Sequence, residues 1–167
     1  MMNIAKLDEI PKAEKIVDTP IDDLLSVYKV CQEMDEVCTN EEGIGLSAVQ
    51  VGIPWRLFIL KNSSGNFESF VNCRYEPVVS EGKSASVEGC LSLKPNGKLR
   101  RFRLERWNKI RLVGHVLFVD HKGKLNLKKI DYETQPDIYN IVYQHEIDHQ
   151  KGILISDLGE EIEVSNE

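Results

Sequence analysis

Two histidines four residues apart, with a glutamate directly after the first, restrict the fold of this chain more than any other feature. They are His145 and His149, with Glu146 between them, in the segment YQHEIDH. On an α-helix, residues four apart lie on one face, so both imidazoles can bind the same metal ion. Glu146 lies roughly 100° further round the helix, where it can reach a water on the metal. The pattern predicts a helix with two metal ligands and a general base, although two histidines on a solvated helix face would share this spacing.

The size and charge of the chain exclude several classes of protein. Its 167 residues favour a single catalytic domain over 1–167, with an irregular arm at 1–18 and a frayed acidic tail at 158–167. The net charge of −6 argues against a nucleic-acid partner, because phosphate contacts need a basic surface. No apolar run approaches the roughly 20 residues of a membrane span. The N-terminus lacks the apolar core of a signal peptide, so we expect a cytoplasmic protein with no membrane partner.

Four cysteines are present and none forms a CxxC pair, so free thiols are expected in a cytosolic chain. Cys31 and Cys38 lie on an apolar stripe with a spacing of three or four residues, which predicts a helix over 20–39 with both thiols in the core. Thr19 is the expected N-cap of this helix. Cys90 follows a glycine in a short polar segment, which instead indicates an exposed or functional thiol.

The rest of the chain alternates between strand patterns and turns. Pro136 opens a second long helix, which carries the two histidines and stops at Gly152. Gly114 interrupts a strand pattern and is interpreted as a bulge. A strand-rich middle with one helix before it and one after it predicts an α+β fold. The expected strands and extended stretches are 55–60, 67–72, 76–87, 107–120, 125–132 and 153–155.

A run of basic residues between Lys98 and Arg111 is the main positive feature of this acidic chain. Such a run is typical of a solvated strand or loop face. Within it, we expect Arg103 to pair with Glu88, a carboxylate two residues before Cys90.

A tetrahedral catalytic metal site needs a third protein ligand and one open position. A glutamate on a second downstream helix is excluded, because only about 18 residues follow His149. No histidine follows shortly after Gly152, and we interpret His115 and His121 as structural or solvated. Cys90 is the natural third ligand, since a thiolate binds zinc or ferrous iron well.

Three motifs carry a resemblance to the peptide deformylase family, over roughly residues 15–157. They are GIGLSAVQ at 43–50, EGCLS at 88–92 and QHEIDHQKG at 144–152. The family has GxGLAAxQ, EGCLS and QHExDHxxG in the same order. Two departures are Ser47, in place of the first alanine, and Gln150, in place of a common leucine. The resemblance implies β-sheets wrapped around a central HExxH helix.

The resemblance also implies the chemistry of the site. Cys90, His145 and His149 would hold one divalent metal ion, with Fe²⁺ as the native ion and Zn²⁺ or Ni²⁺ as substitutes. Metal-bound water would attack the formyl carbon of an N-formylmethionyl polypeptide, and formate would be released. Glu146 would be the general base and then the general acid.

Two donors would hold the formyl oxygen as it gains charge, the side chain of Gln50 and the backbone N–H of Leu91. By the same resemblance, apolar residues would surround the methionine side chain, and two glycines would lie beside the peptide backbone. These substrate-binding residues are Ile44, Gly45, Gly89, Ile138, Ile141 and Val142.

The expected partners are nascent chains that begin with formylmethionine, and the expected state is a monomer. Many bacterial members of the family continue into a C-terminal helix that docks on the ribosome, whereas this sequence stops earlier, so ribosome docking stays open. A broader metallopeptidase and a non-catalytic, metal-stabilised binding protein are the alternatives. Glu146 and Gln50 argue against the second alternative, because neither is needed to hold a structural metal.

Overall fold

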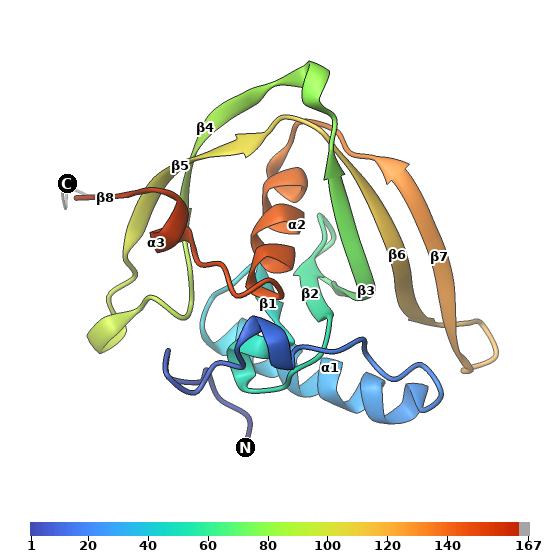
Figure 1. Cartoon of the computed structure of the whole chain (residues 1–167). Helices are drawn as coiled ribbons and strands as arrows, with labels where there is room; N and C mark the ends of the chain where they lie inside the picture. The colour runs from blue at the N-terminus through green and yellow to red at the C-terminus, as the bar shows by residue number, and fades with distance from the viewer. Residues whose placement is uncertain (164–167) are drawn as a thin grey trace.

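The computed structural model describes residues 1–163, which form two antiparallel sheets and a central helix (Figure 1). Within this part, the sheets have the strand orders β1-β2-β3-β6-β7 and β4-β5-β8. The strands are β1 Gly45–Ser47, β2 Leu57–Lys61, β3 Phe67–Pro77, β4 Lys83–Gly89, β5 Arg101–Trp107, β6 Ile110–Val119, β7 Leu125–Glu133 and β8 Glu160–Ile162. The helices are α1 Leu24–Asn40, α2 Ile138–His149 and α3 Ile155–Leu158, with 3-10 helices η1 Ala13–Lys15, η2 Ala48–Val51, η3 Val79–Glu81 and η4 Pro95–Gly97.

The five-stranded sheet contains the irregularity that the sequence attributes to Gly114. β6 runs through Gly114 without a break, and the register shift lies opposite, in β3 between Val71 and Arg74. Asn72 has a φ of 53° there, in the left-handed region. A side chain at position 114 would meet the Cα atom of Cys73 at 2.7 Å. The bulge therefore belongs to β3, and glycine is needed in β6 because the bulged backbone approaches it closely.

The segment before the C-terminus differs from its sequence pattern. The pattern predicts a strand at residues 153–155, but α3 begins at Ile155. The Asp157 carboxylate accepts the N–H of Leu154 at 2.8 Å, which favours a helix start over an extended chain. An apolar run this short does not distinguish a strand from the entry to a helix.

Part of the expected frayed tail at 158–167 forms a strand instead. β8 pairs with the first residues of β5, and Arg100 forms an ion pair with Glu161 at 2.6 Å. The acidic composition of this segment complements the basic start of β5 across the sheet. Residues 164–167 of the tail lie outside the described part of the chain.

α1 begins at Leu24 rather than at residue 20, because Asp23 and not Thr19 is its N-cap. The Asp23 carboxylate accepts the N–H of Ser26 at 3.1 Å. Thr19 is buried and donates its hydroxyl to the carbonyl of Arg56, the residue before β2, at 2.9 Å. The predicted apolar stripe is buried only in its second half. Cys31, Met34 and Cys38 lie in the core as expected, whereas Leu24 and Tyr28 are partly buried and Ile21, before the helix begins, is exposed.

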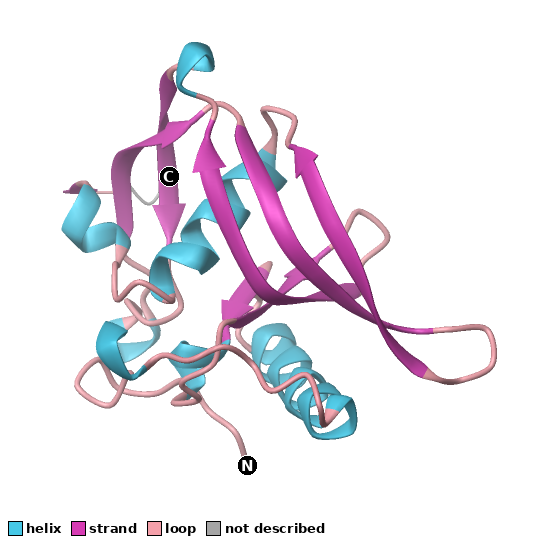
Figure 2. Cartoon of the chain, turned by 45° about the vertical axis from the view of Figure 1, so that its right-hand side comes forward, coloured by secondary structure: helices cyan, strands magenta, loops and turns pink. Residues whose placement is uncertain are grey.

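α2 lies between the two sheets and is buried over almost its whole length (Figures 1 and 2). Asp137 caps it by accepting the N–H of Asn140 at 3.0 Å. One face packs against stacked aromatic rings of the five-stranded sheet, Phe58 and Phe70, whose centroids are 4.8 Å apart. The predicted α+β fold, with sheets wrapped around the HExxH helix, is confirmed.

The segment at 1–18 is mostly irregular and is fixed to the body at several points. Ile16 is buried, and Val17 forms an isolated parallel bridge with Trp55. Near the start, the N–H of Ala5 donates to the carbonyl of Gln50 at 2.8 Å. Within residues 1–163, no helix is long and apolar enough to cross a membrane.

Candidate active site

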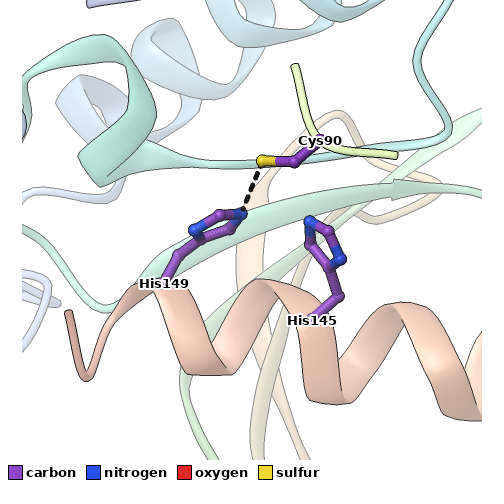
Figure 3. Close-up of side chains that lie close together, drawn as sticks. All are labelled: Cys90, His145 and His149. Carbon is purple, nitrogen blue, oxygen red and sulfur yellow. Dashed lines mark hydrogen bonds between the residues drawn. The ribbon is translucent and has the colours of Figure 1, made fainter. Parts of the chain in front are cut away.

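Three buried side chains from two distant segments meet above α2. His145 and His149 rise from the same face of the helix, one turn apart, and Cys90 faces them from the end of β4 (Figure 3). Their potential ligand atoms all lie within 4.8 Å of one another, and Cys90 Sγ is 3.5 Å from His149 Nε2. The sequence indicates an exposed or functional thiol at Cys90. The thiol is 2% exposed, so the expectation of exposure is wrong, and its functional role stays a prediction that its place in the cluster supports.

The side chains present fit a metal ion. One thiolate and two imidazoles are donors that bind zinc and ferrous iron, and three protein ligands leave a position for water or substrate. Glu146 is buried beside the cluster, and its Oε2 atom has no hydrogen-bond partner within residues 1–163. A buried carboxylate oxygen without a partner is costly unless it binds water, substrate or an ion.

Glu88 orients His145 from behind the cluster. Its Oε2 atom is 2.8 Å from His145 Nδ1, which leaves Nε2 as the ligand atom. Arg106 holds Glu88 through two hydrogen bonds of 2.8 and 2.9 Å and also pairs with Asp148 on α2. Burial acts to raise the pKa of Glu88, but Arg106 and His145 outweigh it and hold the pKa at about 2.

The expected pair between Glu88 and Arg103 is wrong. Along β5, residues alternate between the two faces of the sheet, and Arg103 points outward while Arg106 is buried. Arg103 lines a separate surface hollow beside β8. The alternation is visible in the sequence, since Phe102 and Leu104 mark the inward face on which Arg106 falls.

The pKa values of the other groups suit their positions. Burial raises the pKa of Glu146 to about 7, so its carboxyl can exchange a proton near neutral pH. Burial also holds the pKa of His149 well below its usual value, so this imidazole is neutral. For His145, burial lowers the pKa, but contacts with Cys90 and Glu88 outweigh burial and raise it to about 10.

Gln50 lies beside the cluster on η2. Its Oε1 atom accepts the N–H of Ser47 at 2.9 Å, as part of a capping box around the 3-10 helix. Its Nε2 atom donates to Ser92 Oγ at 3.1 Å and lies 3.6 Å from Cys90 Sγ. The contact of Ser92 with Gln50 could not be predicted, because a serine in a short loop gives no periodic signal of its own.

The cluster opens into a pocket of about 810 Å³ between β1 and β4. Both strands are edges of their sheets, so the pocket separates two sheet edges. An ion pair of 2.9 Å between Lys94 and Glu41 joins the two sides of the pocket wall. The lining includes all the residues expected to contact a substrate, together with the expected chemical residues other than His149: Ile44, Gly45, Gly89, Ile138, Ile141 and Val142, with Gln50, Cys90, Leu91, His145 and Glu146.

Two histidines lie away from this site, as expected. His121 is exposed in the turn between β6 and β7, and His115 lies on β6.

The network behind His145 continues to Tyr75, which donates its hydroxyl to Asp148 at 3.0 Å. Sequence reasoning missed the roles of Tyr75 and Asp148, because the contacts of Asp148 with Tyr75 on β3 and Arg106 on β5 are long-range in sequence.

An HExxH helix with a cysteine as third potential ligand, facing an open pocket, defines the class of metal-dependent hydrolases. Comparisons with known proteins identify the family within this class. The model of the family described as polypeptide deformylase matches residues 9–163. This chain belongs to the polypeptide deformylase family.

Individual relatives agree with this assignment. The peptide deformylase of Heliobacterium modesticaldum is 31% identical over 130 residues, which cover 77% of this chain and 75% of that protein. The structure of peptide deformylase from Thermotoga maritima has a TM-score of 0.72 and 26% identity, and the match covers 96% of this chain and 98% of that one. The actinonin-bound class I type b enzyme of Acinetobacter baumannii has the same fold, with a TM-score of 0.73, 23% identity and coverage of 96% and 99%.

Proposed function

We propose that this chain removes the N-formyl group from polypeptides that begin with formylmethionine and releases formate. The observation that carries the proposal is the buried Cys90, His145 and His149 cluster with Glu146 at the base of an open pocket, in a chain of the deformylase family. A hydrolase needs an activated water, a base and donors to the developing oxyanion, and candidates for each are within this pocket.

Cys90, His145 and His149 would hold one divalent ion, and Fe²⁺ is the proposed native ion, with Zn²⁺ or Ni²⁺ as substitutes. When bound, the ion supplies Lewis acidity, which polarises the formyl oxygen and lowers the pKa of water. Glu88 keeps His145 oriented for this role through its hydrogen bond to Nδ1.

Glu146 is the proposed general base and acid. Its raised pKa, about 7, allows it to take a proton from the attacking water and to give a proton to the leaving amine. Gln50 Nε2 and the backbone N–H of Leu91 are the proposed donors to the formyl oxygen. Loss of one such donor typically lowers the rate by about 10²–10³-fold.

The apolar part of the pocket would bind the methionine side chain. Ile44, Ile138, Ile141 and Val142 are the proposed contacts, and Gly45 and Gly89 would allow the peptide backbone to lie between β1 and β4. A side chain at position 45 would meet Glu146 Oε1 at 2.7 Å. Gly45 is therefore suited to keep both the base and the substrate backbone unobstructed.

The proposal is tested by formate release from a formyl-Met tripeptide, with protein loaded with Fe²⁺ or Ni²⁺ under anaerobic conditions. We expect fast release by the unaltered chain and a loss of about 10²–10⁴-fold in Glu146→Ala. Metal content should be equal in the two proteins. Acetyl-Met and unformylated peptides are the controls. Cleavage of unformylated peptides without release of formate would contradict the proposal and favour a broader metallopeptidase.

We also propose that the chain acts in the cytoplasm, as a monomer, on nascent polypeptides. The fold without a membrane-spanning helix in residues 1–163 is compatible with this location. Analytical ultracentrifugation of the metal-loaded chain tests the monomer, and a stable dimer would contradict it.

A further inference from the structure

The backbone of Gln50 is anchored by the first residues of the chain. Gln50 lies on η2, and a helix of one turn leaves its last carbonyls without partners of its own. The N–H of Ile53 donates to the Ala48 carbonyl at 3.0 Å, and the N–H of Gly52 donates to the Val49 carbonyl at 3.1 Å. The Gln50 carbonyl instead accepts the N–H of Ala5, at 2.8 Å.

The arm that brings Ala5 to this position is itself held on both sides of the contact. Met2 and Ile4 pack against the core cluster that contains Leu46 and Ala48, which lie four and two residues before Gln50 in the chain. Further along, the arm is joined to the body where Val17 bridges to Trp55 and where Ile16 is buried. The hydrogen bond from Ala5 therefore comes from a segment with little freedom to move.

The side-chain amide of Gln50 is fixed separately, through Ser47 at Oε1 and Ser92 at Nε2. Gln50 is thus held at two ends, by its side chain toward Cys90 and by its carbonyl toward the arm. A donor to an oxyanion acts only when it points at the place where charge develops, and a small displacement is costly. The hydrogen bond from Ala5 to the Gln50 carbonyl is therefore expected to affect the position of the Gln50 amide and not the apolar part of the pocket.

We propose that the N-terminal arm, through the N–H of Ala5, positions Gln50 as the donor to the formyl oxygen. This inference rests on the proposed deformylase function. When the hydrogen bond is lost, η2 can rotate and carry the amide away from the oxyanion. Binding of the methionine side chain is unaffected, because no residue of the arm at 1–18 is among the residues that line the pocket. The turnover number should fall and KM should stay the same.

The test compares Ala5→Pro, which removes the N–H, with Ala5→Gly, which keeps it. We expect Ala5→Pro to lower kcat by about 3–10-fold with KM unchanged, the scale of one lost hydrogen bond. Ala5→Gly should stay within about twofold of the unaltered chain. Thermal unfolding and the visible absorption of the Co²⁺-loaded protein should show that both variants are folded with the metal site intact.

A double-mutant cycle with Gln50→Ala separates positioning from a general structural effect. If the arm acts through Gln50, Ala5→Pro should cause no further loss of kcat in the Gln50→Ala background. An equal loss in both backgrounds, or a change confined to KM, would overturn the inference. If Ala5→Pro fails to fold, Ile4→Ser loosens the same arm and is put through the same cycle, with the same two outcomes.

Failure of this inference is distinguishable from failure of the proposed function. No formate release by the unaltered, metal-loaded chain rejects the function. Normal release by the unaltered chain and by Ala5→Pro alike rejects only the role of the arm.

Discussion

Asp35 on α1 has a carboxylate oxygen that is buried without compensation for its charge among residues 1–163. Its Oδ1 atom is buried without a hydrogen-bond partner among the described residues, and burial raises its pKa from 3.8 to about 6. The folded chain therefore holds this proton more tightly than the unfolded chain does. The contribution of the protonated Asp35 carboxyl to the free energy of unfolding is fully present below pH 3.8. This contribution is lost as the pH rises through about 6.

Asp35→Asn should remove this pH dependence. We expect the variant to be more stable than the unaltered chain at neutral pH, with the advantage shrinking as the pH falls below the raised pKa. Urea unfolding of both proteins across that pH range measures the difference. Asp22→Asn, at an exposed position on the surface, is the control. A constant difference between Asp35→Asn and the unaltered chain at all pH values would contradict the assignment.

Gln150 is a second buried polar side chain without partners. It is 4% exposed, and neither its Oε1 nor its Nε2 atom has a hydrogen bond within residues 1–163. Each such group costs about 1–3 kcal/mol, so Gln150→Leu should raise the free energy of unfolding by about that amount. The same change at Gln144, whose amide bonds to Trp107 and Asn140, should lower it. Equal effects at the two positions would be inconsistent with this account.

At the scale of the residue, the sequence indicates which residue types could form a metal site better than it indicates which particular side chains pair with each other. His145, His149 and Glu146 are proposed from the HExxH spacing and Cys90 from the need for a third ligand, and the structure brings the three candidate ligands together. The choice of Arg103 over Arg106 failed, since both are arginines in one basic run and only strand alternation separates them. Thr19 failed as a helix cap for a similar reason, because Asp23 is an equally good cap a few residues later.

The buried ion pairs of Arg106 connect three elements of the fold. Arg106 on β5 joins Glu88 on β4 to Asp148 on α2, so one side chain links the three-stranded sheet to the metal-ligand helix. Removal of one partner from a buried ion pair typically costs about 3–5 kcal/mol, because the remaining charge is left without compensation. Here two carboxylates would lose the same cation.

Arg106→Leu is therefore expected to destabilise the chain by about 3–5 kcal/mol. It should also weaken metal binding by about 10–100-fold, because Glu88 no longer orients His145. Chemical unfolding and competition with a chromogenic chelator measure the two effects. Arg103→Leu, on the outer face of the same strand, is the matched control and should change neither by much. A larger effect of Arg103→Leu than of Arg106→Leu would contradict this account and favour a pair between Glu88 and Arg103.

Most elements could be predicted, and their ends could not. Strands β2, β3, β4, β6 and β7 and both long helices overlap stretches expected from the sequence, since an apolar stripe or an alternation extends over many residues. The sequence does not predict β1, and β5 lies in the basic run that is expected only as a solvated strand or loop face. β8 and α3 are too short for such a signal. β8 exists because Glu160–Ile162 meets the edge of β5 and Arg100 meets Glu161, and these contacts are long-range in sequence.

For the whole molecule, the arrangement explains why three separated motifs form one site. α2 lies between the sheets, β1 brings η2 and Gln50 to one side, and the end of β4 brings Cys90 to the other. The division into two sheets could not be predicted from strand patterns alone, because each strand has several compatible partners. The resemblance to a known family supplied that information, and the fold agrees with it.

The central claim is that Cys90, His145 and His149 together hold the metal on which the activity depends. X-ray absorption of the zinc-loaded chain tests it most directly. We predict one sulfur ligand at about 2.3 Å and two imidazole nitrogens at about 2.0–2.1 Å, with one metal ion per chain. The sulfur signal should disappear in Cys90→Ser. A shell of nitrogen and oxygen ligands without sulfur in the unaltered chain would contradict the account.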